Sequence, residues 1–98
     1  MTTLVLEQDP VAVEVSVDGM ALTVTLQDGR QLRVPLSWYP RLQAGTPAER
    51  DAWEILGDGY AVAWPGLDEH IGVEGLLAGR RSAEKPEAFG RWLAARRQ

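Results

Sequence analysis

Residues 11–36, VAVEVSVDGMALTVTLQDGRQLRVPL, decide the fold that the sequence predicts. Within this stretch, runs of alternating apolar and polar residues have the two-residue period of strands with one buried face. Asp18-Gly19 and Asp28-Gly29 separate the runs, and an Asp-Gly pair favours the tight turn of a β-hairpin. The stretch therefore predicts a three-stranded antiparallel meander. Its predicted strands are residues 11–17, 21–26 and 31–34.

The same alternation predicts which side chains of the meander face the core. In the first strand, Glu14 and Ser16 fall on the face opposite the valines. A strand with this pattern buries its apolar face and exposes its polar one. The side chains predicted to point inward are Val11, Val13, Val15, Val17, Leu22, Val24, Leu26, Leu32 and Val34.

Proline and threonine predict the start of a helical region after the meander. Pro35 has no N–H group, so it ends the third strand or places that strand at a sheet edge. Thr46-Pro47-Ala48-Glu49 combines a capping threonine, a proline suited to the first helical position and a glutamate that can close a capping box. This run predicts a short helix that begins at Pro47 and continues towards Trp53.

Glycines divide the following part of the chain. Gly57-Asp58-Gly59 predicts a turn, and residues 60–64 predict a further strand or hairpin. Residues 67–71 have a polar and irregular pattern, so we expect no regular element there. Residues 73–78 predict a short helix that ends at Gly79, since glycine readily adopts the left-handed conformation that closes helices.

The C-terminal part predicts a charged linker and a last helix. Residues 80–85 are rich in charge, and Pro86 suits the start of an amphipathic helix. In that helix Phe89, Trp92 and Leu93 share one face.

The expected fold class is α+β. The prediction comprises the N-terminal three-stranded antiparallel meander, the further strand or hairpin, short helices packed on one face and the C-terminal amphipathic helix. We expect one domain over residues 1–79, with residues 80–98 as a linker and helix packed on it.

Composition excludes several classes of protein. The chain has 98 residues, a length typical of one domain. Its 45% apolar residues and four tryptophans can form a core, and the absence of cysteine excludes disulfides, thiolate zinc sites and cysteine nucleophiles. The N-terminal residues lack the pattern of a signal peptide, and no apolar run approaches the roughly 18 residues of a membrane span. We therefore expect a cytoplasmic protein without a membrane segment.

No residue pattern predicts catalysis. His70 is the only histidine, and no serine lies in a nucleophile-elbow motif. Asp68, Glu69 and Glu74 near His70 offer metal ligands, but their spacing matches neither a calcium loop nor a zinc pattern. We expect no enzyme activity, no cofactor and no metal.

An aromatic and arginine set provides the candidate partner-binding residues. Aromatic rings dominate small cores, so burial is one interpretation of the set. The other is a partly exposed groove that binds a protein, because Trp, Tyr and Arg are enriched among interface anchors. The candidate residues are Trp38, Tyr39, Arg41, Arg50, Trp53 and Trp64.

Basic residues are concentrated at the C-terminal end. Residues 80–98 carry six of the ten basic residues, although the whole chain has a formal charge of −4. This asymmetry could serve a nucleic acid, an acidic partner or the protein's own acidic face. The residues that would contact a nucleic acid are Arg91, Arg96 and Arg97.

Residues 28–79 carry a set of short motifs. They are Asp28-Gly29-Arg30, Val34-Pro35-Leu36, Trp38-Tyr39-Pro40-Arg41-Leu42, Thr46-Pro47, Arg50, Trp53, Gly57, Gly59, Trp64-Pro65, Leu67-Asp68-Glu69, Ile71 and Val73-Glu74-Gly75-Leu76-Leu77. This set resembles the Domain of Unknown Function 2442 family of small bacterial proteins. The resemblance implies an antitoxin-like member of a two-protein system, with a protein partner encoded by a neighbouring gene, and it carries over no catalytic residue. We therefore expect a non-enzymatic protein-interaction module, with regulatory nucleic-acid binding through the C-terminal helix as the alternative, and either a monomer or a homodimer.

Overall fold

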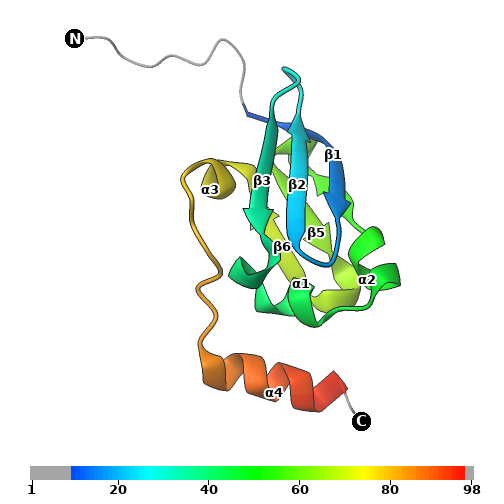
Figure 1. Cartoon of the computed structure of the whole chain (residues 1–98), viewed down its shortest axis with the longest axis vertical. Helices are drawn as coiled ribbons and strands as arrows, with labels where there is room; N and C mark the ends of the chain where they lie inside the picture. Colours follow the sequence, from blue (N-terminus) through cyan, green and yellow to red (C-terminus); the bar gives the residue numbers. More distant parts are fainter. Residues whose placement is uncertain (1–9, 97–98) are drawn as a thin grey trace, which may run out of the picture.

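Two antiparallel sheets of three strands each form the body of the protein in the computed structural model, which describes residues 10–96 (Figure 1). The first sheet has the order β1-β2-β3, as the sequence predicts for the meander. Its strands are β1 (Ala12–Val17), β2 (Ala21–Leu26) and β3 (Gln31–Pro35). Both Asp-Gly turns are present: the Asp18 side chain accepts hydrogen bonds from Met20 N and Ala21 N, and the Asp28 side chain accepts one from Arg30 N. The α+β class and the meander are thereby confirmed.

The first strand contains a β-bulge that the alternating sequence does not reveal. Ala12 pairs with Leu26 and Glu14 pairs with Thr25, so β1 has one extra residue between the two pairs. Val13 consequently lies on the outer face with 52% of its surface exposed, and Ala12 is buried in its place. The prediction that Val13 points inward is wrong, because a bulge reverses the alternation on one side of itself.

The further strand predicted near residues 60–64 belongs to a complete second sheet. This sheet has the order β4-β5-β6 and is antiparallel throughout. Its strands are β4 (Glu54–Leu56), β5 (Ala61–Trp64) and β6 (Glu69–Gly72). Three of the four residues of β6, Glu69 to Ile71, belong to the segment 67–71 for which the sequence predicts no regular element. Only its pairing with β5, through Val62 and Ile71 among others, makes this polar segment a strand.

Short helical segments connect the strands. The capping box of α2 forms as predicted: Thr46 Oγ1 accepts from Glu49 N at 3.1 Å, and Glu49 Oε1 accepts from Thr46 N at 2.9 Å. Gly79 closes α3 with a φ of +74°, also as predicted. The α-helices are α1 (Pro40–Ala44), α2 (Pro47–Asp51), α3 (Val73–Leu77) and α4 (Pro86–Arg96), and the 3₁₀ segments are Leu36–Trp38, Gly57–Gly59 and Pro65–Leu67.

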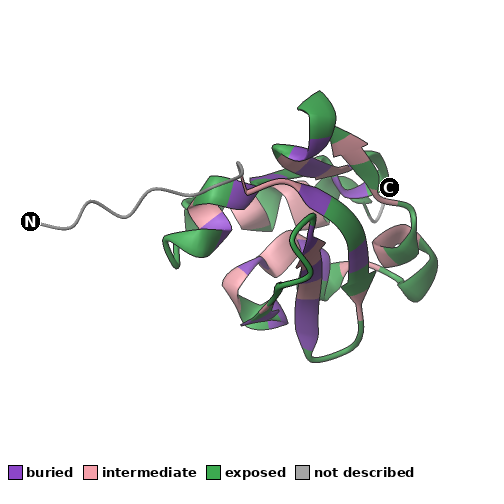
Figure 2. Ribbon diagram, turned by 90° about the horizontal axis from the view of Figure 1, so that it is seen from above, coloured by how far each residue is buried: buried purple, intermediate pink, exposed green. Residues whose placement is uncertain are grey.

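The core lies between the inner faces of the two sheets. Along the central strands β2 and β5, buried residues alternate with residues of intermediate burial, and Figure 2 colours the chain by burial. The side chains of Leu22, Leu26, Val62 and Trp64 have at most 1% of their surface exposed. Burying such side chains contributes about 1.5–3 kcal/mol each to the free energy of unfolding. The two sheets therefore stabilise each other through one shared core.

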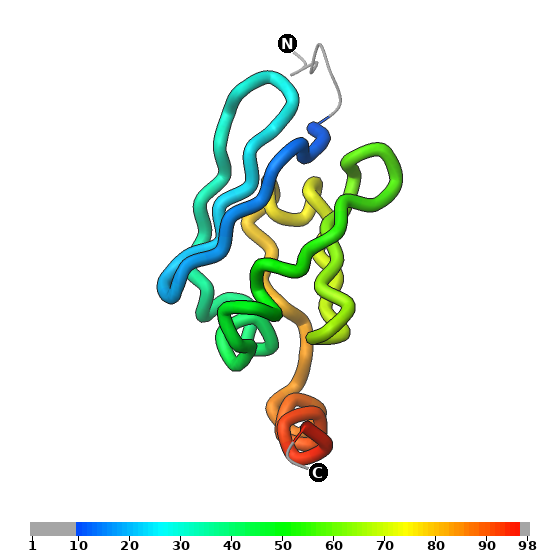
Figure 3. The backbone as a smooth tube through the Cα atoms, turned by 90° about the vertical axis from the view of Figure 1, so that its right-hand side faces the viewer, coloured from blue at the N-terminus to red at the C-terminus, as the bar shows by residue number. Residues whose placement is uncertain are grey.

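The last helix lies beyond the sheets, on the same side as α1 and α2 (Figures 1 and 3). An extended segment leads from the end of α3 to Pro86, where α4 begins. None of the eleven residues of α4 is fully buried, although Trp92 packs partly against the core. Within residues 10–96, no helix is long and apolar enough to cross a membrane.

Candidate functional site

The structure divides the aromatic candidates between core and surface. The rings of Trp64 and Tyr39 are buried, with 0% and 4% of their surface exposed. Trp38 and Trp53 are half-buried and pack against the same core. A buried ring offers no surface to a partner, so Trp64 and Tyr39 are core residues rather than parts of an open groove. The aromatic set therefore does not form one exposed patch.

Arg50 holds helices together. Its Nε donates to Leu42 O at 2.8 Å and its Nη2 donates to Gln43 O at 2.6 Å. These carbonyls lie in α1, near its C-terminal end, where helical carbonyls need partners from outside the helix. The backbone carbonyl of Arg50 accepts a hydrogen bond from Trp64 Nε1 at 3.0 Å. The guanidinium of Arg50 is thus committed to linking α2 with α1.

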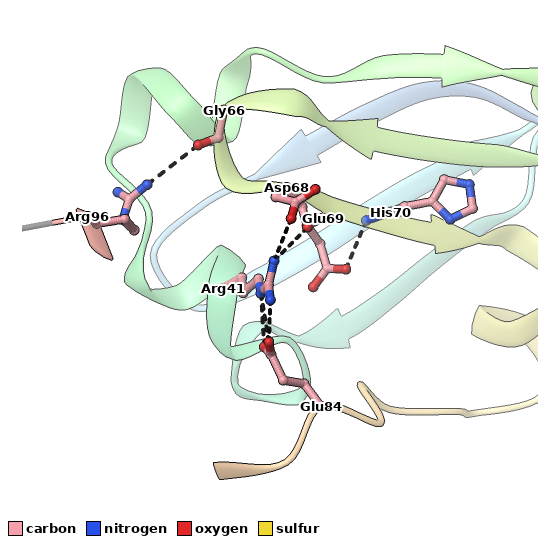
Figure 4. A network of polar contacts seen from close by, with 7 residues as sticks. All are labelled: Arg41, Gly66, Asp68, Glu69, His70, Glu84 and Arg96. Carbon is pink, nitrogen blue, oxygen red and sulfur yellow. Dashed lines mark hydrogen bonds and ion pairs between the residues drawn. The ribbon is translucent and has the colours of Figure 1, made fainter. Parts of the chain in front are cut away.

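Arg41 lies at the centre of a polar network that joins three separate parts of the chain (Figure 4). Its Nε contacts both carboxylate oxygens of Glu84, at 3.0 and 2.9 Å, and its Nη2 also contacts Glu84. Its Nη1 donates to Asp68 O at 2.9 Å and lies 3.3 Å from Asp68 Oδ2. The hydrogen bonds that Arg41 donates to the Glu84 carboxylate raise the pKa of Arg41 above its ordinary value. Arg41 therefore fastens the linker before α4 to the body.

The C-terminal helix docks on the body through Arg96 and Trp92. Arg96 donates two hydrogen bonds to the carboxylate of Glu49, at 3.0 and 2.7 Å, and its Nη1 lies 3.5 Å from Gly66 O. The guanidinium carbons of Arg41 and Arg96 lie 5.0 and 4.7 Å from the centroid of the Trp92 ring. Both distances fit cation–π contacts.

These contacts define a surface that we call the helix-docking face. It consists of Arg41 on α1, Glu49 on α2, and Gly66 and Asp68 around the turn between β5 and β6. The face offers one cation to an aromatic ring and one carboxylate to a guanidinium. Arg–carboxylate pairs with two hydrogen bonds are both stronger and more directional than single contacts.

Glu49 has two roles in this arrangement. Its carboxylate accepts from Arg96 and also from the backbone N–H of Thr46 in the capping box. Together, first through Arg96 and then through Thr46, these bonds lower the pKa of Glu49 to about 2. The carboxylate that caps α2 is therefore also the anchor for α4.

The linker between α3 and α4 is tied to the aromatic part of the site. The hydroxyl of Tyr39 donates to Arg80 O at 2.9 Å, and Trp38 O accepts from Ser82 N at 3.0 Å. The guanidinium of Arg81 lies 4.8 Å from the centre of the Trp38 ring. Trp38, Tyr39 and Arg41 therefore lie close together, although not in an open groove. They contact residues 80–84 of the linker.

A pocket of about 210 Å³ lies between β6 and this linker. Burial raises the pKa of its Glu69 carboxyl, while the hydrogen bond from His70 N opposes the effect. The His70 ring points away from the Arg41 network (Figure 4), and Ser82 Oγ accepts from Glu84 N at 3.2 Å. The pocket is lined by Tyr39, Glu69, His70, Ile71, Gly72, Gly75, Arg80, Arg81, Ser82 and Ala83.

The candidate metal ligands do not gather into a metal site. Over residues 10–96, no group of three or more His, Asp or Glu side chains is placed to hold an ion. The carboxylate of Asp68 is 90% exposed and faces Arg41, and the N–H of His70 donates to Glu69.

Two of the basic C-terminal residues, Arg81 and Arg96, contact the body of the protein through their side chains. Arg96 binds Glu49, Arg81 lies over Trp38, and Arg91 is exposed on α4. Arg97 lies outside the described residues. The basic cluster could serve a nucleic acid, an acidic partner or an acidic group of the same chain, and the contact of Arg96 with Glu49 is an example of the last.

Sequence reasoning missed Glu49, Glu84 and Trp92 as site residues. The sequence assigns Glu49 only to the cap of α2, and it assigns Trp92 to an apolar helix face that could either form a dimer or pack on the protein's own sheet. One local signal exists, because Trp92 and Arg96 are four residues apart and so share a helix face. Nothing local connects that pair with Glu49, which lies 47 residues away from Arg96 in the sequence.

Comparison with known proteins agrees with the fold. A crystal structure of a protein of unknown function from Rhodospirillum rubrum is 28% identical, with a TM-score of 0.68, over 79% of this chain and 95% of that one. An uncharacterised protein from Chromobacterium violaceum, solved by NMR, is 24% identical, with a TM-score of 0.65, over 82% of this chain and 75% of that one. The second likeness shows the fold alone.

The family comparison covers most of the chain. No curated protein matches the sequence. A family model described as "Protein of unknown function (DUF2442)" matches residues 12–82, which confirms the resemblance found in the motifs and leaves α4 outside the matched region. The chain belongs to the DUF2442 family of proteins of unknown function.

Proposed function

We propose that this protein is a small, non-enzymatic interaction module that binds a protein partner through the surface around Trp38, Arg41 and Glu49. One observation carries the proposal. This surface already holds a peptide segment, the chain's own residues 80–96, through an ion-paired arginine on each side and rings stacked against guanidinium groups. A surface that binds one peptide by side-chain contacts has the chemistry to bind another.

The specific form of this proposal is the antitoxin-like member of a two-protein system, with a partner encoded by a neighbouring gene. The family resemblance supports this form, while the contacts support peptide binding in general. Complementary charges contribute to the specificity of protein interfaces, and the helix-docking face offers both an anion and a cation.

The partner can be identified by affinity capture with the tagged full-length protein from its native host, with and without nuclease, read by mass spectrometry. We expect one dominant protein that nuclease does not remove. Trp38→Ala and Arg41→Ala should then abolish its capture while circular dichroism and thermal unfolding show an intact fold. Arg33→Ala, which removes an exposed arginine on β3, should capture the partner normally.

Two outcomes would contradict the proposal. Normal capture by both variants would place the partner elsewhere, and unfolding of both would show that these side chains serve stability alone. Recovery that depends on nucleic acid would favour the alternative, regulatory binding through α4. Such binding should weaken steeply between low and physiological salt and should be lost in Arg91→Glu, whose side chain is exposed.

A further inference from the structure

Helix α4 is held by polar and aromatic surface contacts, whereas the two sheets are held by a buried apolar core. None of its residues is fully buried, and its contacts with the body involve two arginines, a glutamate and one partly buried tryptophan. The side chains of Arg96 and Glu49 keep 27% and 26% of their surface exposed. Ion pairs with this exposure contribute about 1 kcal/mol or less, because water and salt screen them. The helix is therefore docked by contacts that can open without unfolding the sheets.

We propose that α4 is a tethered substitute for a partner's helix. The helix-docking face would bind a helical segment of the partner that carries a tryptophan and, four residues later, an arginine, and α4 must leave the face before that segment can bind. This inference rests on the proposed function, and it adds the chemistry of the partner and a means of regulation.

The chemistry of the partner follows from the contacts that α4 makes. Residues four apart lie on one face of a helix, which allows Trp92 to reach Arg41 while Arg96 reaches Glu49. The face requires a ring against the Arg41 guanidinium and a fork of donors for the Glu49 carboxylate and Gly66 O. Lysine would satisfy the charge of Glu49 but not its two parallel hydrogen bonds. An aromatic residue and an arginine at this spacing are therefore the recognition pair.

The tether determines how strongly α4 competes. A ligand on a short flexible linker has an effective concentration on the order of 1 mM, and the linker before α4 is also held by Tyr39, Trp38 and Arg41, so its effective concentration is at least of that order. If the detached helix bound with a Kd of about 0.1 mM, α4 would cover the face roughly ten times more often than it leaves it open. The apparent Kd of any competing helix would then rise about tenfold, because only the open molecules can bind it.

A labelled peptide tests this competition in the full-length protein. The probe is a synthetic peptide of residues 80–96 with an N-terminal fluorophore, and the reading is fluorescence anisotropy. In Arg96→Glu the protein's own helix loses its anchor while the face keeps Glu49. We expect this variant to bind the peptide about tenfold more tightly than the wild type does. Arg91→Glu makes the same charge change at an exposed position of α4 and should bind like the wild type.

Glu49→Gln identifies the face itself. Glutamine can replace glutamate in a capping box, so α2 should keep its cap while the charge is lost. In the Arg96→Glu background, this second change should weaken peptide binding at least tenfold. A peptide with Trp92→Ala should bind equally poorly to Arg96→Glu. Thermal unfolding of each variant establishes that its body remains folded.

Three results would overturn the inference. The first is equal peptide affinity of the wild type, Arg91→Glu and Arg96→Glu. The second is no binding of the peptide to Arg96→Glu up to about 1 mM, the effective concentration of the tether. The third is sedimentation of the wild type as a dimer that exchanges its α4 helices, which would make a second copy of the chain the occupant. If peptide binding fails while partner capture still depends on Trp38 and Arg41, only the tethered-helix inference falls. If capture fails as well, the proposed function falls with it.

Discussion

Glu69 and Gly59 are single positions in the body that affect the stability of this protein. Glu69 is a carboxyl group in the pocket beside the linker, where burial raises its pKa above the ordinary 4.5. A raised carboxyl pKa means that the folded protein favours the neutral form over the charged one. The resulting cost in stability is absent below pH 4.5, grows between 4.5 and the raised pKa, and is complete above it.

Glu69→Gln should therefore stabilise the protein at neutral pH. Glutamine stays neutral and its side-chain oxygen can still accept from His70 N, so the variant avoids the cost of ionisation. Urea unfolding from pH 4 to pH 8 should show an advantage that shrinks as the solution becomes more acidic. Glu14→Gln, an exposed change on β1, controls for the loss of one negative charge. A constant or reversed difference across this range would contradict the assignment.

Gly59 allows the second sheet to approach the first strand. Its φ is +102°, and a β-carbon at this position would lie 2.8 Å from both Ala12 O and the β-carbon of Val11. Gly59→Ala should destabilise the protein by about 2 kcal/mol or more, because strain of about 1–2 kcal/mol adds to a clash with backbone. Guanidinium unfolding measures the loss.

Gly57→Ala provides the matched control for Gly59. Gly57 also has a positive φ, of +57°, but a β-carbon there would meet no atom within 4 Å. This variant should lose only the strain energy, about 1 kcal/mol. Equal losses at the two positions would mean that β1 moves aside without cost.

At the scale of elements, local signals predicted those elements that are stabilised by their own residues. The capping box of α2 and the glycine that closes α3 could both be predicted from the sequence, because each acts within one turn of its helix. Strand β6 was missed because its residues have no apolar alternation of their own. It is a strand because β5 lies beside it.

Thr46→Ala tests the local origin of α2. Removal of the hydroxyl leaves Glu49 N without its partner at the first turn, which should cost about 1 kcal/mol of stability. Thr46→Ser keeps the acceptor and should cost much less. Thermal and urea unfolding of the three proteins give the comparison. If alanine and serine behave alike, the cap contributes nothing and α2 depends on packing alone.

At the scale of the whole molecule, the docking of α4 should respond to acid through Glu49. The pKa of this carboxyl is lowered from 4.5 to about 2, with Arg96 as the first cause. A lowered pKa means that the docked state favours the charged carboxylate. The interaction of this carboxylate with Arg96 therefore contributes its full stabilisation above about pH 4.5, and the stabilisation is lost as the pH falls towards 2. We expect the NMR shift of the Glu49 carboxyl carbon to titrate with a midpoint near 2.

Arg96→Gln separates the two causes of that low pKa. Without the guanidinium, only the hydrogen bond from Thr46 N still favours the charged carboxylate, so the midpoint should move up towards 4.5. Arg91→Gln, on the exposed side of α4, should leave the midpoint unchanged. A low midpoint that persists in Arg96→Gln would show that α4 does not dock through this pair.

The sequence by itself determined the meander, its Asp-Gly turns, the capped helix α2, the end of α3 and the family. These features depend on backbone preferences and side-chain bonds within a few residues, and those are the same before and after folding. The bulge in β1 could not be predicted from the sequence, because Ala12 and Val13 are both apolar and either could occupy the inward position.

Only the tertiary structure decided which candidate residues reach the surface. Trp64 and Trp38 are the same residue type, yet Trp64 is buried in the core and Trp38 is only half-buried, with the guanidinium of Arg81 over its ring. Arg96 meets Glu49 across 47 residues because two sheets and a linker bring α4 beside α2. Contacts between distant segments depend on how the whole chain packs, and no short stretch of sequence contains that information.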